Sequence, residues 1–321
     1  MGNVIKLTNE QLKAIYHGVL WYQETEDGYL QAFQYTKEQN EYFEKVSDFW
    51  FERCTASSAK TLEFTTAATF CSFEYKILWT GSLDSVELWI DNQAMEICYL
   101  KDIEKEGTIS FKLPESPAPK NVTIYLPADG TIVLRNFEIN GEFEPVTKKE
   151  KVLWMGDSIT QGFGPLRSAH TYVSVANRLL NYEVLNQGIG GYVYDKNVLM
   201  QMYDYKPDKI IISMGTNQFG TESMEGIEEY YKLLKEIYGD TPVLCILPLW
   251  RGDVPNGEPT LIKFCANLKK IAEQYDNVTI VDGFKLVPHL PEYFMDNLHP
   301  NCLGSEVYGR NLVREIEKAG F

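Results

Sequence analysis

The sequence predicts an α/β protein in which an all-β sandwich precedes a doubly wound parallel sheet of about five strands. Two observations lead to this fold class. Short β-type runs separated by turn residues dominate the first part of the chain, and strand-like runs alternate with helical stretches from Lys151 onward. The chain has 321 residues, more than one ordinary domain needs. We therefore expect a sandwich domain over residues 1–145 and a second domain over residues 146–321.

The predicted sandwich begins with one short helical pattern, from Thr8 to Ile15. The runs that follow are rich in Val, Ile, Thr, Tyr and Phe, and some alternate apolar with polar residues, as FEYKILW and SVELWID do. Such alternation is typical of antiparallel strands with one buried face. We expect these strands at Phe49–Cys54, Leu62–Thr66, Cys71–Trp79, Ser85–Asp91, Thr108–Leu113, Asn121–Leu126 and Thr131–Ile139.

The second half contains five nearly continuous apolar runs: VLWMGDS, YEVLNQG, KIIISMG, PVLCILPL and VTIVDGF. Strands of a parallel sheet are buried on both faces and read in this way. Between these runs and after the last one, the sequence predicts helices at Tyr172–Leu180, Glu225–Tyr238, Leu261–Tyr275 and Ser305–Lys318. In sheets of this kind, the working residues gather at the carboxyl ends of the strands.

The charge and the cysteines exclude several classes of protein. The net charge is −15, and Lys+Arg against Asp+Glu number 14 against 24 in residues 1–150 and 16 against 21 in residues 151–321. Both halves are acidic, so nucleic acids and anionic membranes are poor partners. The six cysteines are scattered without a CxxC pair, and we expect no disulfide, no metal site and no cofactor. The first residues, MGNVIKLTNEQLKAIY, lack the apolar core of a signal peptide, and a cytoplasmic location is expected.

Residues suited to acyl transfer follow the predicted strands. Ser158 lies in Gly156-Asp157-Ser158 after the first strand, a glycine-rich turn ending at Gly191 follows the second, and Asn217 follows the third. Taken alone, Ser158 is more typical of a cap or a phosphate-binding turn, Asn217 is more typical of a helix cap, and the glycine turn is as typical of a tight turn without a ligand. Together they place a hydroxyl, exposed backbone N–H groups and a carboxamide at one edge of the sheet.

A base for the serine is present near the C-terminus. His299 is one of four histidines, and Asp296 precedes it by three residues. A serine nucleophile needs a base to take its proton, and the histidine needs an acceptor on its other ring nitrogen. Alone, D-x-x-H is more often a surface turn. In this context it supplies the two groups that Ser158 lacks.

These four blocks resemble those of the SGNH (GDSL-type) hydrolase superfamily, which supply Ser, Gly, Asn and His in this order. Gly156-Asp157-Ser158, Asn186 to Gly191, Gly215-Thr216-Asn217 and the pair Asp296 and His299 match them, although Gln218 replaces an Asp that often follows the asparagine. The resemblance implies a flavodoxin-like catalytic sheet. It also implies Ser158, His299 and Asp296 as the catalytic triad, and an oxyanion hole made by the backbone N–H groups of Ser158 and Gly191 and the amide of Asn217.

An N-terminal sandwich before such a domain is similar to the arrangement of two-domain carbohydrate esterases, which carry a jelly-roll-like first domain. The resemblance implies a small acyl group, most simply acetyl, on a small-molecule or oligosaccharide ester. Trp250 and Arg251 in the loop after the fourth strand, Tyr192 beyond Gly191, and Asp157 are candidate substrate contacts. For the aromatic residues, packing between loops is an equally good interpretation.

Three other interpretations remain open. The enzyme could be a lysophospholipase or thioesterase of the same superfamily. It could be a carbohydrate-binding protein with an inactive catalytic fold, although the four intact blocks argue against this. The first domain could act mainly as an oligomerisation surface, because the sequence leaves the oligomeric state open.

Overall fold

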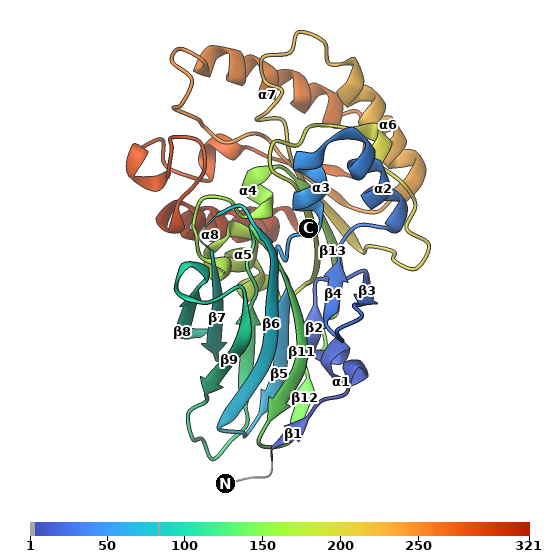
Figure 1. The fold of residues 1–321 in the computed structure, drawn as a ribbon. Helices are drawn as coiled ribbons and strands as arrows, with labels where there is room; N and C mark the ends of the chain where they lie inside the picture. The colour runs from blue at the N-terminus through green and yellow to red at the C-terminus, as the bar shows by residue number, and fades with distance from the viewer. Residues whose placement is uncertain (1–3, 83) are drawn as a thin grey trace.

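Two antiparallel sheets of the N-terminal part pack face to face in the computed structural model, which describes residues 4–82 and 84–321 (Figure 1). The first sheet has the strand order β3-β4-β11-β6-β9, with β1 paired to β11, and the second has the order β12-β5-β10-β7-β8, with β2 paired to β5. Their inner faces share one apolar core, which includes Phe64, Phe73 and Phe137. The strands of the first sheet are β1 (Ile5–Lys6), β3 (Trp21–Glu24), β4 (Leu30–Phe33), β6 (Phe70–Thr80), β9 (Glu106–Lys112) and β11 (Gly130–Ile139); those of the second are β2 (Tyr16–His17), β5 (Thr61–Thr66), β7 (Ser85–Ile90), β8 (Gln93–Tyr99), β10 (Lys120–Tyr125) and β12 (Phe143–Pro145).

Three helices accompany the sandwich strands: α1 (Asn9–Ile15), α2 (Lys37–Val46) and α3 (Asp48–Cys54). The first was expected, and the side chain of Thr8 caps it. The strand predicted at Phe49–Cys54 is wrong, because this segment forms α3. Its aromatic residues resemble a β-strand, but the hydroxyl of Ser47 accepts a hydrogen bond from the backbone N–H of Trp50 and starts a helix.

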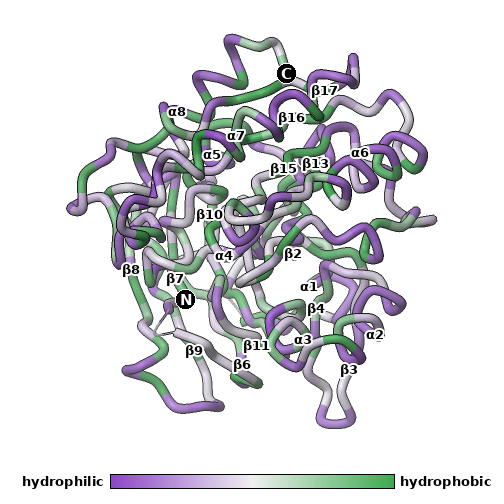
Figure 2. Tube along the Cα trace, turned by 90° about the horizontal axis from the view of Figure 1, so that it is seen from above, coloured by the Kyte–Doolittle hydropathy of each residue, from purple (hydrophilic) through white to green (hydrophobic). Residues whose placement is uncertain are grey.

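The C-terminal sheet is parallel and has five strands in the order β14-β13-β15-β16-β17, as the fold class predicted. Helices α5 and α8 cover one face and α6 and α7 the other. In Figure 2, the strands β13 and β15 lie between α5 and α6. The bounds are β13 (Lys151–Gly156), α4 (Ser158–Gln161), α5 (Tyr172–Leu180), β14 (Glu183–Gly188), β15 (Lys209–Ser213), α6 (Glu225–Tyr238), β16 (Val243–Ile246), α7 (Glu258–Ala272), β17 (Val278–Val281) and α8 (Cys302–Ala319).

The two parts of the chain share a core. Tyr35, Phe43 and Cys54 are buried in the same apolar cluster as Met155 and Ile212 of the parallel sheet. The hydroxyl of Tyr35 also donates a hydrogen bond to the backbone carbonyl of Gln187, 2.7 Å away. Helices α2 and α3 therefore belong to the packing of the parallel sheet as well as to the N-terminal half of the sequence.

Within the described residues, no helix has the length and apolarity needed to span a bilayer. All six cysteines are free, and four of them are buried.

A glycine at the end of β14 lets the helix that carries Ser158 lie against the sheet. A β-carbon at Gly188 would lie 2.4 Å from the backbone nitrogen of Gln161 and 2.7 Å from the backbone carbonyl carbon of Thr160. Both contacts are with backbone atoms of α4, so a side chain can be accommodated only by moving the helix.

We expect Gly188→Ala to lower the free energy of unfolding by about 1–3 kcal/mol, because overpacking forces backbone shifts. Urea denaturation followed by circular dichroism measures this change. Gly226→Ala is the matched control, because no atom lies within 4 Å of a β-carbon at this position in α6. It should leave stability unchanged or raise it by about 0.5–1 kcal/mol. Equal effects of the two substitutions would contradict the close approach of α4.

Candidate active site

Ser158 is the first residue of α4 and directly follows β13. The side chain of Asp157 caps this helix by accepting a hydrogen bond from the backbone N–H of Ile159 at 3.0 Å. In the parallel sheet, Gly156 pairs with Gly188 on one side and with Ser213 on the other. The segments that follow these strands therefore leave the sheet side by side, with Ser158 between the glycine turn and the asparagine turn.

A series of hydrogen bonds joins Ser158 to residues 141 and 138 positions later. The Oγ of Ser158 lies 2.8 Å from Nε2 of His299, and Nδ1 of His299 lies 2.7 Å from Oδ2 of Asp296. The other oxygen of Asp296 accepts a hydrogen bond from the backbone N–H of His299 at 2.8 Å. With Nδ1 facing a carboxylate, the consistent tautomer carries its proton on Nδ1 and leaves Nε2 free to accept one.

The loop that carries His299 is closed on itself. A β-bridge pairs Phe294 with Pro300, and the backbone N–H of Met295 donates to the carbonyl of His299 at 2.8 Å. The ring of Phe163 meets the ring of His299 edge-on, with centroids 4.7 Å apart. These contacts hold the imidazole in one orientation.

The pKa of Asp296 is lower than that of a free aspartate. Burial acts to raise it, but the hydrogen bonds from the backbone and the ring of His299, the charge of that ring and the backbone N–H of Leu298 together outweigh burial. The carboxylate is therefore ionised at neutral pH and can accept the hydrogen bond from Nδ1 of His299.

The two backbone N–H groups and the carboxamide that the sequence predicts as donors to an oxyanion lie in the segments that follow β13, β14 and β15. In the described part of the chain, no hydrogen bond engages the backbone N–H of Ser158 or of Gly191, and Gly191 has a φ of +70° that favours glycine. Nδ2 of Asn217 donates to the carbonyl of Tyr192 at 2.9 Å, which fixes the plane of the amide and leaves its second N–H. The side chain of Gln218 accepts a hydrogen bond from the N–H of Tyr194 at 2.8 Å and so holds the same turn.

The structure places the four residues predicted to contact substrate in different surroundings. Asp157 is buried at the start of α4, and its contact with substrate stays a prediction. Tyr192 is also buried, with its ring packed edge-on against Phe43 and Trp50, which is the packing alternative given for the aromatic residues; its contact with substrate stays a prediction. In both cases the residue adjoins the site along the chain, but its side chain is packed in the interior.

The guanidinium of Arg251 braces the asparagine turn. It forms a two-pronged ion pair with Asp253, at 2.8 and 2.6 Å, and donates to the carbonyl of Thr216 at 2.6 Å. These bonds engage all three of its nitrogens and its side chain is 10% exposed, so Arg251 supports this turn, and its contact with substrate stays a prediction. Trp250 is half-buried, and its ring stacks on that of His289 with centroids 5.4 Å apart.

One wall of the site, which the sequence pattern did not predict, comes from the N-terminal half. A β-carbon at Gly190 would lie 3.1 Å from Cδ of Arg53, and one at Gly191 would lie 3.5 Å from the ring of Phe49. Both side chains belong to α3, and the guanidinium of Arg53 lies 3.5 Å from the centroid of the Phe49 ring. The strand predicted at this segment would not have placed these residues beside the glycine turn.

Gln161 was also missed. Its Oε1 accepts a hydrogen bond from the N–H of Gly190, and its Nε2 donates to Asp129 of the sandwich, both at 2.7 Å. The sequence feature that could have pointed to Gln161 is its position three residues after Ser158. Among the described residues, no cluster of three or more His, Cys, Asp and Glu side chains is arranged to hold a metal ion.

Residues 154–307 match the sequence model of the GDSL-like Lipase/Acylhydrolase family. The chain carries a domain of this family. It is accordingly a carboxylic-ester hydrolase of the GDSL type. No curated protein is similar enough in sequence to count as a match.

Solved structures share the fold of the whole chain. The salicylyl-acyltransferase SsfX3 from a tetracycline biosynthetic pathway has a TM-score of 0.76 at 17% identity, over 99% of this chain and 98% of that one. A family two carbohydrate esterase from Cellvibrio japonicus has a TM-score of 0.68 at 16% identity, with coverage of 99% and 98%. The acetyl xylan esterase Est2A from the rumen bacterium Butyrivibrio proteoclasticus has a TM-score of 0.64 at 16% identity, with coverage of 99% of both chains. The arrangement of a sandwich followed by a GDSL-type domain is therefore shared with carbohydrate esterases of known structure.

The buried carboxyl of Asp157 makes stability depend on pH. Burial raises its pKa to about 7, well above that of a free aspartate, although the hydrogen bond from Ile159 and the charge of Arg251 act in the opposite direction. The folded protein therefore binds this proton more tightly than the unfolded chain between pH 4 and pH 7. Across that window, the contribution of Asp157 to stability falls as the pH rises, and above pH 7 it is constant.

We expect Asp157→Asn to be more stable than the parent by about 1–4 kcal/mol at pH 8, with the difference vanishing toward pH 4, because the amide can cap α4 without ionising. Urea unfolding at several pH values measures the difference. Asp204→Asn, at an exposed aspartate, is the control and should show no such trend. A difference that grows toward acid pH would show that Asp157 is ionised at little cost in the fold.

Proposed function

We propose that the GDSL hydrolase uses Ser158, His299 and Asp296 to remove a small acyl group, acetyl in the first instance, from an ester of a sugar. The observation that carries the catalytic part is the continuous pair of hydrogen bonds, 2.8 Å from Ser158 to His299 and 2.7 Å from His299 to Asp296. These distances lie within the range that proton transfer requires.

In the proposed mechanism, Oγ of Ser158 attacks the ester carbonyl carbon while Nε2 of His299 takes the hydroxyl proton. The carbonyl oxygen becomes an oxyanion, which the N–H groups of Ser158, Gly191 and Asn217 stabilise. The intermediate collapses as His299 gives its proton to the leaving alcohol, and an acyl-serine remains. Water then attacks this acyl group with its proton passing to His299, and the carboxylic acid and free Ser158 are released.

The orientation of the imidazole supports the role of Asp296. Because the carboxylate also accepts the backbone N–H of His299, the ring and its loop are fixed by the same group. The lowered pKa of Asp296 keeps it charged while the imidazolium forms. This arrangement is prepared before substrate binds, which is the condition for electrostatic stabilisation to accelerate the reaction.

The substrate class rests on the architecture and on the walls of the site. The fold over the full chain is similar to that of carbohydrate esterases, including an acetyl xylan esterase. Trp250, stacked on His289 beside the loop of His299, is the aromatic side chain we propose as a sugar platform. Phe49 and Phe163 offer apolar surface near Gly191 and His299, and this surface suits a short acyl group.

We expect Asn217→Ala to lower kcat on p-nitrophenyl acetate by about 10²–10³, equivalent to about 3–4 kcal/mol of lost transition-state stabilisation. Ser158→Ala should remove activity and labelling by a fluorophosphonate probe while the protein stays folded. Steady-state kinetics and circular dichroism of the same samples measure both effects. Asn9→Ala, at a partly exposed asparagine of α1, is the matched control. An active Ser158→Ala enzyme would disprove the proposed nucleophile.

For substrate preference, p-nitrophenyl esters of increasing chain length separate the candidates. We expect acetate to be cleaved with a higher kcat/KM than octanoate, and acetylated xylo-oligosaccharides to release acetate. A preference for octanoate would favour the lysophospholipase or thioesterase alternative. If no acetylated sugar releases acetate while p-nitrophenyl acetate is still the preferred test ester, the enzyme is a short-chain esterase and the proposed sugar substrate is rejected.

A further inference from the structure

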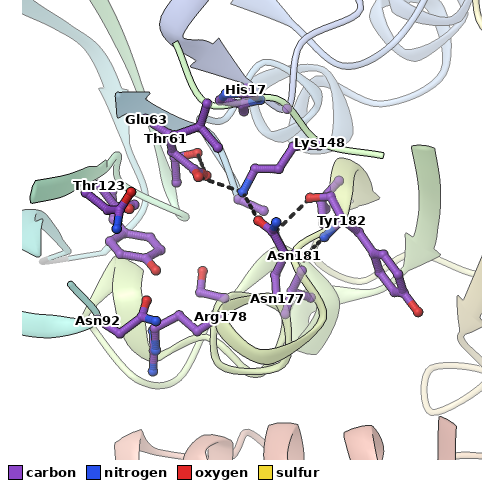
Figure 3. Close-up of a pocket in the computed structure, with 18 of the residues that line it drawn as sticks. His17, Thr61, Glu63, Asn92, Thr123, Lys148, Asn177, Arg178, Asn181 and Tyr182 are labelled. Carbon is purple, nitrogen blue, oxygen red and sulfur yellow. Dashed lines mark hydrogen bonds and ion pairs between the residues drawn. The ribbon is translucent and has the colours of Figure 1, made fainter. Parts of the chain in front are cut away.

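A second cavity lies between the sandwich and α5, at the edge of the parallel sheet opposite Ser158 (Figure 3). Its volume is about 300 Å³, and its lining includes Lys148 and Tyr182, which precede β13 and β14. Ser158 follows the other end of β13. Six strand residues separate the two edges, so the cavity and the nucleophile are about 20 Å apart.

The charges that line this cavity balance. Nζ of Lys148 lies 2.6 Å from Oε2 of Glu63, with both side chains almost enclosed. Arg178 donates to the carbonyl of Ala169, and Asp91 accepts two hydrogen bonds from Asn121. Two cations and two anions leave no net charge, so neither an anion nor a cation is favoured as the occupant.

Uncommitted polar groups face the cavity from both walls. Within the described residues, no hydrogen bond engages the side-chain hydroxyl of Thr123 or the side-chain amide of Asn92 on the sandwich wall. On the α5 wall, Oδ1 of Asn181 accepts a hydrogen bond from Lys148 at 2.7 Å, which leaves its NH₂ group. Figure 3 shows Thr123 and Asn92 on one side of the cavity and Asn181 on the other.

A hydroxyl and a carboxamide each donate and accept hydrogen bonds, which matches a ligand that carries several hydroxyl groups. The ring of Tyr125 adds an aromatic surface to the lining. The volume lies at the lower end of that of ligand pockets, so it suits one small molecule rather than a polymer. A sulfate or phosphate would meet Glu63 and Asp91 as well as the two cations.

We propose that this cavity is a second, non-catalytic site for a neutral saccharide unit, formed jointly by β10, the turn between β7 and β8, and the C-terminal end of α5. The ligand bridges the sandwich and the GDSL domain through hydrogen bonds to Thr123, Asn92 and Asn181. The inference does not depend on the proposed reaction, because no residue of the catalytic series lines the cavity.

The test uses saturation-transfer NMR to measure binding of D-glucose, D-galactose, D-mannose and D-xylose to the Ser158→Ala protein, which is the parent of the variants below. We expect saturable binding of at least one sugar in the millimolar range. Thr123→Phe fills the cavity while keeping a residue that favours strands, and it should abolish binding. Thr108→Phe, at an exposed threonine of β9 in the other sheet, is the matched control and should bind as the parent does.

A second variant keeps the test decisive if Thr123→Phe does not fold. Thr123→Val removes only the hydroxyl and should weaken binding by about twofold to tenfold, the effect of one neutral hydrogen bond. Unchanged binding in the folded Thr123 variants would place the sugar elsewhere and overturn the proposal. The proposal would also be overturned if none of the four sugars binds to the parent, or if inorganic phosphate binds more tightly than any sugar. Esterase assays do not enter this test, so failure of the proposed reaction and failure of this site are read separately.

Discussion

The hydrogen bond between Ser158 and His299 is the interaction on which the rest of the GDSL domain depends. It joins two segments separated by 141 residues, and neither segment has regular structure long enough to hold itself in place. Ser158 is fixed by a one-turn helix whose position follows from the glycines at the ends of β13 and β14. His299 is fixed by a closed loop that touches the turn at Gly164, where a β-carbon would lie 2.4 Å from the carbonyl of Pro300. The geometry is therefore set by close backbone approaches rather than by long helices.

The N-terminal half takes part in this geometry through α3. Its residues Phe49 and Arg53 lie against the glycine turn that supplies Gly191, and Gln161 connects the same turn to Asp129 of the sandwich. A displacement of the sandwich would thus reach the backbone N–H groups near Ser158 through two separate contacts. The sandwich is in this respect a support of the site, and the shared core around Tyr35 and Phe43 gives the support its rigidity.

The sequence was sufficient for the five parallel strands and for six of the twelve sandwich strands that the structure describes, since burial on one or two faces leaves a periodic pattern. It was insufficient at Phe49–Cys54, where an aromatic run outweighed the cap at Ser47. The helix α2 had a readable signal, because Thr36 and Gln39 form a capping box at its start. The orientations of the Tyr192 and Arg251 side chains have no comparable signal in the sequence. They depend on neighbours from other segments, Phe43 and Trp50 for the first and Thr216 for the second, which periodicity does not reveal.

The contrast between the two edges of the parallel sheet has a physical origin. At the carboxyl edge, strand ends separate into turns that expose N–H groups, and α4 adds the partial positive charge of its first turn, so developing negative charge is stabilised there. At the amino edge, the strands begin beneath the sandwich, and the segments that enter them must satisfy their polar groups away from bulk water. The side chain of Asn177 does this for Tyr182 through both its oxygen and its nitrogen, and Glu183 does it for Gly18 and His17. A junction satisfied in this way is lined with amides, hydroxyls and paired charges. It therefore offers hydrogen bonds without net charge, whereas the opposite edge offers hydrogen bonds suited to an anion.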